Sequence, residues 1–474
     1  MTVMIAYVLA ALVILTMSAA AHYAERLVKR QAVVSLVRAS QYVVPRRFVW
    51  IRRINTALCL LGLAMSAVFG LSGLDAYLLI AGAIALHGNL LFTLYTLVTT
   101  DSAATATHRI GKAFKSPKLA EADLLVFFSG MYLSTPAHVE VWVEPIKAAG
   151  LKVALVMVEA KHFRNACRMW AFPVLYAPTR KEIAAIAVHT KAKAVLYTNN
   201  GFRNNDCLEV MQHLTHVQLL HGDSDKPASY RPGSRNYDRV FVAGQMAKER
   251  YWRAGIDIPN DRFRVVGRPQ VAAITRPTAR EGAPVVGYMP TWEGNYHDMK
   301  FSSLAVASKI MQTLSEALPA SEVLVKPHPL SQSRASWAGQ EAKLRDILGQ
   351  RLSVAVKGTS PFDAYDAVDL LIADISSVII DFLYSGKPII VILPHGFGDE
   401  DLAAFPSLEA CYKVDADLSN LGEILTLATT ADPMRALRED VRHKAFGDIG
   451  REPGEAFREA CEELLAPPPP APTT

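Results

Sequence analysis

From Asp123 onward the chain alternates short apolar runs with longer stretches in which apolar residues recur at helical spacing. Short apolar runs are typical of buried β-strands, and the periodic stretches are typical of amphipathic helices. Alternation of the two predicts parallel sheets flanked by helices. The predicted strands are Leu124–Phe128, Val153–Val158, Val174–Tyr176, Ala194–Tyr197, Val217–Leu220, Val240–Val242, Arg264–Val266, Val285–Tyr288, Val323–Val325, Leu352–Val356, Leu370–Ala373 and Ile389–Leu393.

A polar, proline-containing link at 276–282 divides these strands into two sets of similar size. We therefore predict an α/β protein with twin Rossmann-like domains, over residues 119–270 and 283–465, that face each other across a cleft. The chain contains no G-x-G-x-x-G and no G-x-x-x-x-G-K-[ST] motif, which disfavours dinucleotide-binding and P-loop enzymes. The proline-rich segment 466–474 is predicted to be a disordered tail.

Residues 1–101 have a different pattern, with three long apolar runs at Val3–Ala21, Thr56–Leu71 and Ala76–Val98. Such runs predict a membrane region with about three transmembrane helices. No basic residue precedes the first run, which favours a membrane span over a cleaved signal peptide. Eight Lys and Arg residues lie between the first two runs, so the positive-inside rule places this loop and everything after residue 109 in the cytoplasm. The expected location is the plasma membrane, with several spans and cytoplasmic catalytic domains.

The distribution of charge and cysteines disfavours several classes of partner and site. Residues 22–118 carry twelve Lys and Arg against three acidic residues, a net charge of +9, and the whole chain is +5. Since residues 1–21 are uncharged, residues 119–474 come to −4, which disfavours a nucleic-acid partner. The five cysteines are scattered and predict reduced thiols without a zinc site or disulfide. Because no histidine–carboxylate cluster has metal spacing, we expect no bound metal and no cofactor.

The candidate chemistry follows directly after four predicted strands. These positions hold His221, Gly222 and Lys226; Pro290 and Thr291; Lys326 and His328; and Asp374, Ser376 and Ser377. In open α/β sheets ligands bind at the carboxyl ends of strands, so these residues are expected to line one cleft. Two imidazoles, two lysines and several hydroxyls are suited to phosphate-ester chemistry, with a base for a nucleophile and donors for phosphate oxygens.

The stretch Asp369–Pro394 is predicted to be a β-α-β unit whose helix begins at Ser376 and Ser377. A helix N-terminus favours anions, because its backbone N–H groups are unpaired and its dipole is positive there. Taken alone, serines that only cap the helix would be the better interpretation.

These motifs together resemble the CDP-glycerol glycerophosphotransferase family, which builds teichoic acids and related polyol-phosphate polymers. The resemblance covers roughly residues 217–393 and rests on six motifs in order. They are His221-Gly222 with Lys226, Tyr237-Asp238, Gly267-Arg268-Pro269, Met289-Pro290-Thr291-Trp292, Lys326-Pro327-His328-Pro329 and Asp374-Ile375-Ser376-Ser377-Val378.

The resemblance implies a GT-B fold and transfer of glycerol phosphate from CDP-glycerol, as substrate, to an acceptor hydroxyl with release of CMP. His221 is expected to be the general base, and His328 to assist at the pyrophosphate. The remaining candidates, Gly222, Lys226, Pro290, Thr291, Lys326, Asp374, Ser376 and Ser377, are expected to bind substrate. The implied partners are a CDP-linked polyol donor and a lipid-linked or polymer acceptor at the membrane.

Two departures from the family pattern leave alternatives open. Asp223-Ser224-Asp225 stands where the family has Thr-Pro-Leu, and Glu293 stands where a basic residue is common. The two carboxylates beside His221 are expected to raise its pKa or to orient its ring. The alternatives are a GT-B glycosyltransferase that uses a nucleotide sugar, and a non-catalytic scaffold of the same fold in envelope assembly.

The predicted topology is testable by cysteine labelling of intact cells with a membrane-impermeant reagent. A cysteine introduced near Ser72, in the turn between the second and third apolar runs, is expected to be labelled from outside. One introduced near Ser40, in the basic loop, is expected to be protected until the membrane is permeabilised. The reverse pattern would contradict the orientation and cytoplasmic access to a CDP-linked donor.

Overall fold

The structure is a computed structural model, and it describes residues 34–35, 88, 103–133, 135–274, 282–294, 301–356 and 358–466. The chain divides into two compact units. Unit 1 comprises Met1–Ala137, Lys152–Tyr197 and Gly201–Leu214, and unit 2 comprises His138–Leu151, Thr198–Asn200 and Thr215–Thr474. This division follows other boundaries than the predicted domains 119–270 and 283–465, which stay predictions.

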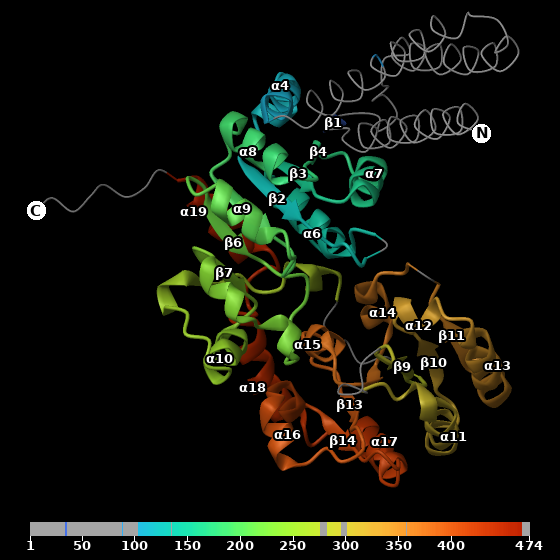
Figure 1. Ribbon diagram of the computed structural model, residues 1–474. Coiled ribbons are helices and arrows are strands. Elements are labelled where there is room, and N and C mark those ends of the chain that lie inside the picture. Colours follow the sequence, from blue (N-terminus) through green and yellow to red (C-terminus); the bar gives the residue numbers. More distant parts are fainter. Residues whose placement is uncertain are drawn as a thin grey trace, which may run out of the picture. The chain divides into compact units, whose positions relative to one another are not determined.

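Unit 1 contains a parallel sheet in the order β4-β3-β2-β5. Figure 1 labels the first three of these strands. Its strands are β2 (Leu124–Phe128), β3 (Val153–Met157), β4 (Val174–Tyr176) and β5 (Ala194–Tyr197). Every residue of the four strands is buried, as expected for a parallel sheet covered on both faces. A short strand β1 (Val34–Ser35), which the hydrophobic pattern did not predict, pairs antiparallel with β4.

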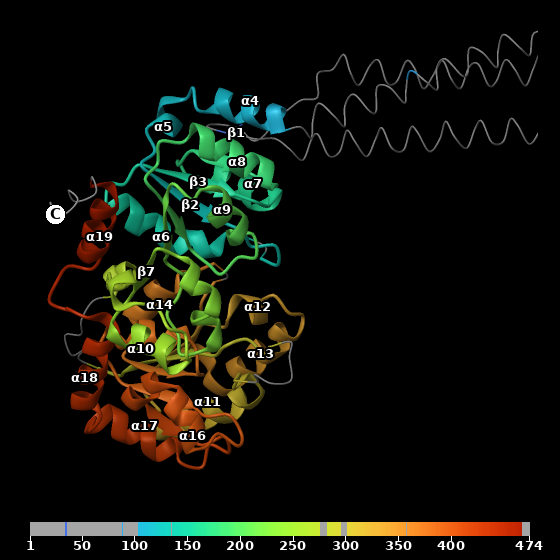
Figure 2. The ribbon, with the colours of Figure 1, turned by 60° about the vertical axis from the view of Figure 1, so that its left-hand side comes forward.

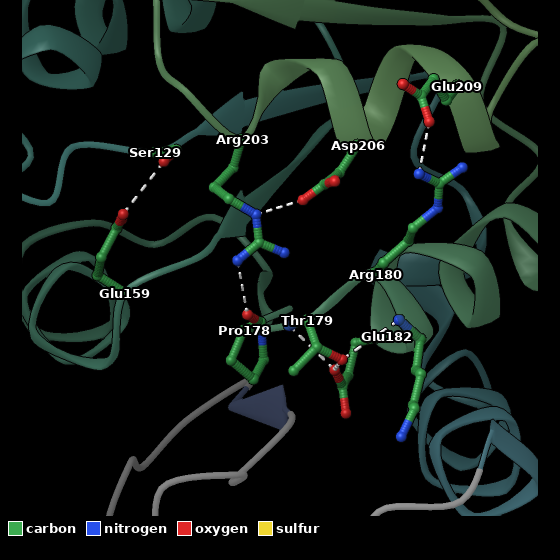
Figure 3. Close-up of polar contacts among 10 residues, drawn as sticks. Ser129, Glu159, Pro178, Thr179, Arg180, Glu182, Arg203, Asp206 and Glu209 are labelled. Carbon is green, nitrogen blue, oxygen red and sulfur yellow. Dashed lines mark hydrogen bonds and ion pairs between the residues drawn. The ribbon is translucent and has the colours of Figure 1, made fainter.

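The helices of unit 1 are α4 (Ala103–Ala113), α5 (Pro117–Ala120), α7 (Ala160–Met169), α8 (Arg180–His189) and α9 (Asn204–Val210). Polar contacts fix the loops that precede them (Figure 3). Thr179 and Glu182 form a capping box at the start of α8. The Glu182 carboxylate accepts the backbone N–H of Thr179 at 3.1 Å, and the Thr179 hydroxyl accepts that of Lys181 at 3.2 Å. Arg203 pairs with Asp206 and donates to the carbonyl of Pro178 at 3.2 Å.

Unit 2 begins with α6 (Ala137–Ala148) and a parallel set of strands in the order β6-β7-β8. These strands are β6 (Thr215–Gln218), β7 (Arg239–Val242) and β8 (Phe263–Val265). The segments between these strands contain α10 (Gln245–Arg253) and the short 3₁₀ helices η1 (Pro227–Ser229), η2 (Pro232–Asn236) and η3 (Asn260–Arg262). A fourth 3₁₀ helix, η4 (Pro269–Ala273), follows β8.

The second sheet of unit 2 is parallel throughout, in the order β11-β10-β9-β12-β13-β14. Its strands are β9 (Val285–Met289), β10 (Glu322–Val325), β11 (Leu352–Val354), β12 (Leu370–Ala373), β13 (Ile389–Ile392) and β14 (Tyr412–Val414). The chain runs outward from β9 in one direction and from β12 in the other. The topological switch point, where ligands of open α/β sheets bind, therefore lies between β9 and β12.

Side chains alternate between two apolar cores on the two faces of this sheet. Val286 and Tyr288 of β9 pack with α11, α13 and α17, whereas Leu371 and Ala373 of β12 pack with α14, α15 and α18. This is the period of two that a strand imposes. The helices are α11 (Ala307–Ala317), α12 (Pro329–Gln332), α13 (Ser336–Leu348), α14 (Pro361–Ala367), α15 (Ser377–Leu383), α16 (Asp399–Ala404), α17 (Leu421–Thr430), α18 (Arg435–Phe446) and α19 (Glu455–Leu465), with η5 (Leu304–Val306), η6 (Gly349–Arg351) and η7 (Pro406–Ala410).

Helices α10 and α18 lie side by side within unit 2 (Figures 1 and 2). A Cβ atom on Gly244, which precedes α10, would lie 2.4 Å from the carbonyl oxygen of Ala445. Only glycine fits at such a distance from backbone, so this contact allows the close approach of the two helices.

The predicted parallel α/β architecture is confirmed, and each of the twelve predicted strands corresponds to a strand of the structure. Some strand ends were wrong by one or two residues, and two short strands, β1 and β14, were not predicted. Strand β6 ends at Gln218 and not at Leu220, and β14 was not predicted because its run is short and contains Lys413.

The predicted membrane spans Val3–Ala21, Thr56–Leu71 and Ala76–Val98 lie outside the described residues, apart from Gly88, which is helical. Among the residues that the structure describes, no helix combines the length and apolar character needed to cross a membrane. Of the predicted tail 466–474, only Ala466 is described, directly after α19.

A buried ion pair joins the two sheets of unit 2. Arg268, which follows β8, donates to Asp381 of α15 from Nε at 2.7 Å and from Nη2 at 3.3 Å. Arg268 is 7% exposed and Asp381 is 4% exposed. Such a bidentate pair is rigid, and the loss of one partner leaves the other charge buried and uncompensated.

We expect Arg268→Met to lower the free energy of unfolding by about 3–5 kcal/mol, because Asp381 would remain buried without its partner. Chemical denaturation followed by tryptophan fluorescence measures this change. The matched control is Arg458→Met, which breaks an exposed pair with Glu462 and is expected to cost at most about 1 kcal/mol. Equal effects of the two substitutions would contradict a structural role for the buried pair.

Candidate functional site

The site is built from the carboxyl ends of strands in unit 2, and the first of these is the turn after β6. Leu220 has a left-handed backbone, with φ of 57°, which is uncommon for a residue with a Cβ atom. The indole N–H of Trp142 on α6 donates to the Leu220 carbonyl at 2.5 Å and holds this conformation. The turn sets the direction in which the next residue, His221, leaves the sheet.

His221 is held as a neutral imidazole. Its Nδ1 lies 3.2 Å from the carbonyl oxygen of Thr198, and a carbonyl only accepts, so Nδ1 carries the proton and donates it. Burial, helped by the nearby guanidinium of Arg268, lowers the pKa of His221 to about 4. At neutral pH the Nε2 atom therefore presents a lone pair.

The two carboxylates after His221 do not act on its ring. Arg250 of α10 binds both, with Nε 2.5 Å from Asp225 and Nη1 against Asp223. Asp225 also accepts the backbone N–H of Ser407 at 2.8 Å. The prediction that they raise the pKa of His221 or orient it was wrong, because a buried cation neutralises them. In this structure Asp223 and Asp225 attach the loop 222–226 to α10 and to the backbone of Ser407.

A small cavity lies behind this turn, lined by Trp142, Leu220, Gly222, Asp223, Arg250 and Arg268 among others. Its volume is about 30 Å³.

Gly222 brings the turn to the start of α15. A Cβ atom on Gly222 would lie 3.8 Å from Cβ of Ser377 and 4.0 Å from Nη2 of Arg268. Ser376 precedes the helix with extended backbone, and its side chain makes no capping hydrogen bond. Its Oγ is buried and has no hydrogen-bond partner among the described residues. The capping interpretation of Ser376 was therefore wrong for its side chain.

Asp374 lies at the switch point between β9 and β12 and is 0% exposed. Its carboxylate accepts the backbone N–H of Thr291 at 2.8 Å and that of Ser303 at 3.1 Å. Burial raises the pKa of Asp374 to about 7, against the opposing effect of these hydrogen bonds. In this structure Asp374 supports the buried Pro290–Thr291 segment, and direct contact with substrate stays a prediction.

Two lysines lie at the same edge of the sheet. The ammonium of Lys226 lies 4.9 Å from the ring centre of Phe301, and burial lowers its pKa to about 8 despite the attraction of Asp374. Burial also lowers the pKa of Lys326, after β10. Among the described residues, no carboxylate lies at ion-pair distance from either lysine, and partly desolvated lysines of this kind are suited to an anionic ligand.

His328 is neutral in the opposite tautomer to His221. Its Nδ1 accepts the backbone N–H of Leu330 at 3.2 Å, so the proton is on Nε2. Burial, helped by the charges of Lys326 and Lys226, lowers the pKa of His328 to about 4. The ring of Trp292 is roughly parallel to that of His328, with ring centres 6.4 Å apart. His328 therefore presents a hydrogen-bond donor and His221 an acceptor.

Glu293, the second departure, is occupied by neighbours of its own. It accepts from the hydroxyl of Ser331 at 2.6 Å and lies 3.7 Å from a guanidinium nitrogen of Arg334. Its charge raises the pKa of His328, but this effect is smaller than burial and the two lysines. Glu293 thus leaves both histidines in their neutral forms.

All ten predicted site residues therefore belong to unit 2, and their roles stay predictions. The structure brings Gly222 to Ser377, and it groups Lys226 with Asp374 and His328. Sequence analysis missed Thr198 and Ser303. A backbone carbonyl and a loop N–H carry no motif that marks them.

Comparison with known proteins bears on this site. Residues 233–395 match the family described as CDP-Glycerol:Poly(glycerophosphate) glycerophosphotransferase. This segment includes Pro290, Thr291, Lys326, His328, Asp374, Ser376 and Ser377. The search of curated proteins finds no match.

Several solved structures are similar in fold. A protein described as a UDP-N-acetylglucosamine 2-epimerase from Listeria monocytogenes is 12% identical, with 73% of this chain and 96% of that chain covered and a TM-score of 0.50. The wall teichoic acid polymerase TagF is 13% identical, with 77% and 92% covered and a TM-score of 0.46. Likeness at these identities concerns the fold alone.

The predicted resemblance is confirmed by the family match, which spans five of the six motifs completely. Its central residues, Lys326-Pro327-His328-Pro329 and Asp374-Ile375-Ser376-Ser377, stand at the carboxyl ends of β10 and β12. Over residues 233–395 the chain is similar to the CDP-glycerol:poly(glycerophosphate) glycerophosphotransferase family, and this match indicates a transferase.

Proposed function

We propose that the protein transfers glycerol phosphate, or another polyol phosphate, from a CDP-linked donor to an acceptor hydroxyl. The product extends a teichoic-acid-like or other cell-envelope polymer, and CMP is released. One observation carries this proposal. Two neutral histidines, His221 and His328, are held in opposite tautomers, one with an available lone pair and one with an available N–H.

The donor's phosphates are proposed to bind at Lys226, Lys326 and the start of α15. Each lysine is partly desolvated, so a nearby phosphate would favour its charged form, and none of the described carboxylates forms a competing ion pair with it. Ser376 and Ser377 would supply hydroxyls and backbone N–H groups. Gly222, near Ser377, leaves space for the donor beside the His221 turn.

In the proposed reaction, the acceptor oxygen attacks the β-phosphorus of the CDP-linked donor. A new P–O bond forms to the acceptor, and the bond from the β-phosphorus to the bridging oxygen breaks, so that CMP leaves with that oxygen. His221 Nε2 takes the acceptor's proton. His328 Nε2–H donates a hydrogen bond to a phosphate oxygen and stabilises the charge that develops there.

The low pKa of free His221 is compatible with this role. A bound diphosphate is anionic, and a negative charge nearby stabilises the imidazolium. The donor would therefore raise the pKa of His221 from about 4 toward neutrality at the moment when a base is needed. The free enzyme would keep the ring neutral and ready to accept.

The domain arrangement and the location of the enzyme are also proposed. The two Rossmann-like regions would adopt a GT-B arrangement, with the acceptor bound by the N-terminal domain and the donor by the C-terminal domain. The apolar runs in residues 1–101 would anchor the enzyme in the plasma membrane with its catalytic domains in the cytoplasm. There it would meet a lipid-linked or polymer acceptor. The supporting observations are the apolar pattern and the basic loop of the sequence.

The donor class is tested by incubation with CDP-glycerol, CDP-ribitol and UDP-sugars, each with a membrane fraction as acceptor source. We expect CMP to be released from at least one CDP-polyol and no UDP from the sugars. UDP release alone would indicate a glycosyltransferase. Absence of turnover together with unimpaired CDP-glycerol binding would indicate the non-catalytic scaffold.

The base is tested by His221→Asn, in which the amide can still donate to Thr198 but no Nε2 lone pair remains. We expect kcat to fall by about 10²–10⁴-fold, the usual contribution of a general base, with donor affinity nearly unchanged. His213→Ala, at an exposed histidine of unit 1, is the control and is expected to behave as wild type. Wild-type turnover of His221→Asn would remove His221 from the mechanism.

The pH dependence of kcat/KM follows from the same groups. His221 has a pKa of about 4 in the free enzyme, so its neutral form is lost only below that pH. Lys226 has a pKa of about 8 and loses its charge above it. We expect a plateau between these values and a decline on the alkaline side, which Lys226→Arg should move to higher pH.

A further inference from the structure

Helix α6 carries a second histidine that contacts the proposed base. The ring of His138 stacks on that of His221, with ring centres 3.4 Å apart and ring planes 3° from parallel. His138 is half-buried and comes from a segment that the family match does not include. The contact is therefore not part of any motif described above.

The same face of α6 also contacts the backbone of Leu220, the residue before His221. Trp142 lies four residues after His138, which places both side chains on one side of the helix. Trp142 donates to the carbonyl of Leu220 at 2.5 Å, and its ring packs 5.1 Å from that of Phe457. One helix thus fixes both the strained residue before the base and the plane of the base itself.

Two constraints together determine where Nε2 of His221 points. The hydrogen bond from Nδ1 to the Thr198 carbonyl fixes one edge of the ring, but on its own it permits the plane to tilt. A parallel ring at van der Waals distance removes that tilt. The lone pair on Nε2 is then aimed in a single direction.

We propose that His138 is a positioning residue for the transfer reaction, which orients the His221 imidazole by stacking on its face. The inference rests on the proposed function of His221 as base. A flat side chain is what this role requires, and the titration of His138 plays no part in it. When His221 accepts a proton, the face of a neighbouring aromatic ring also stabilises the resulting cation.

The test compares His138→Phe, which keeps a flat ring, with His138→Leu, which keeps an apolar side chain without one. CMP release from the active CDP-polyol is measured for both. We expect His138→Leu to lower kcat by about 10–100-fold with the KM for donor within about twofold, because a misaligned base loses rate and not binding. His138→Phe should stay within about threefold of wild type.

His138→Gln serves as a second variant without a ring, and it is expected to follow His138→Leu. It decides the question if His138→Leu does not fold. Equal activities of the Phe variant and both ringless variants would overturn the proposal. So would equal losses in all three, or a loss that appears in the KM for donor.

A spectroscopic measurement separates this proposal from the proposed function. Long-range ¹⁵N spectra of labelled histidine report the tautomer of His221 whether or not the correct donor is known. We expect the single Nδ1–H tautomer in wild type and His138→Phe. In His138→Leu we expect a mixture, because a ring free to tilt makes a weaker hydrogen bond to the Thr198 carbonyl. An unchanged tautomer in all variants would overturn the positioning role, whereas failure of His221→Asn to lose activity would overturn the proposed function.

Discussion

Arg268 is the residue on which the architecture of unit 2 depends most. It follows β8, yet its guanidinium binds Asp381 of α15, on the other sheet, and lies close to Gly222. The ion pair is buried and bidentate, so the His221 turn and the start of α15 keep a defined separation. The same charge helps to keep His221 neutral. One cation therefore sets both the geometry and the protonation of the proposed site.

Burial has opposite consequences for the acidic and basic groups of this site. It lowers the pKa of both histidines and both lysines, and it raises the pKa of Asp374. The neutral form is favoured each time, because desolvation penalises charge of either sign. Clusters of shifted groups in one place are typical of functional sites. An anionic ligand would reverse much of this shift for the four basic groups.

Much of the fold was predictable because its signal is local. The run Leu370–Ala373 corresponds residue for residue to β12, since an apolar run bounded by Asp369 and Asp374 admits little else. Strand β6 was extended too far because Leu219 and Leu220 are apolar, although the chain already turns there. Hydrophobicity alone does not reveal a left-handed residue, whose conformation depends on Trp142 from a distant helix.

The candidate residues of the site were predictable from strand ends, but their electrostatics were not. Asp223 and Asp225 were expected to act on His221, and the structure pairs them with Arg250, twenty-five or more residues away. Similarly, His138 reaches His221 only because α6 returns to the end of β6. Partners of this kind are set by tertiary packing, and no spacing in the sequence identifies them.

The lowered pKa of Lys226 makes this side chain a target for covalent inhibitors, since only an uncharged amine is nucleophilic. With a pKa of about 8, roughly a tenth of this side chain is uncharged at pH 7, against well under a thousandth for an ordinary lysine. Lys226 would then react with aryl esters or sulfonyl fluorides far sooner than surface lysines do. Its place beside Phe301 offers an aromatic warhead a surface to pack against.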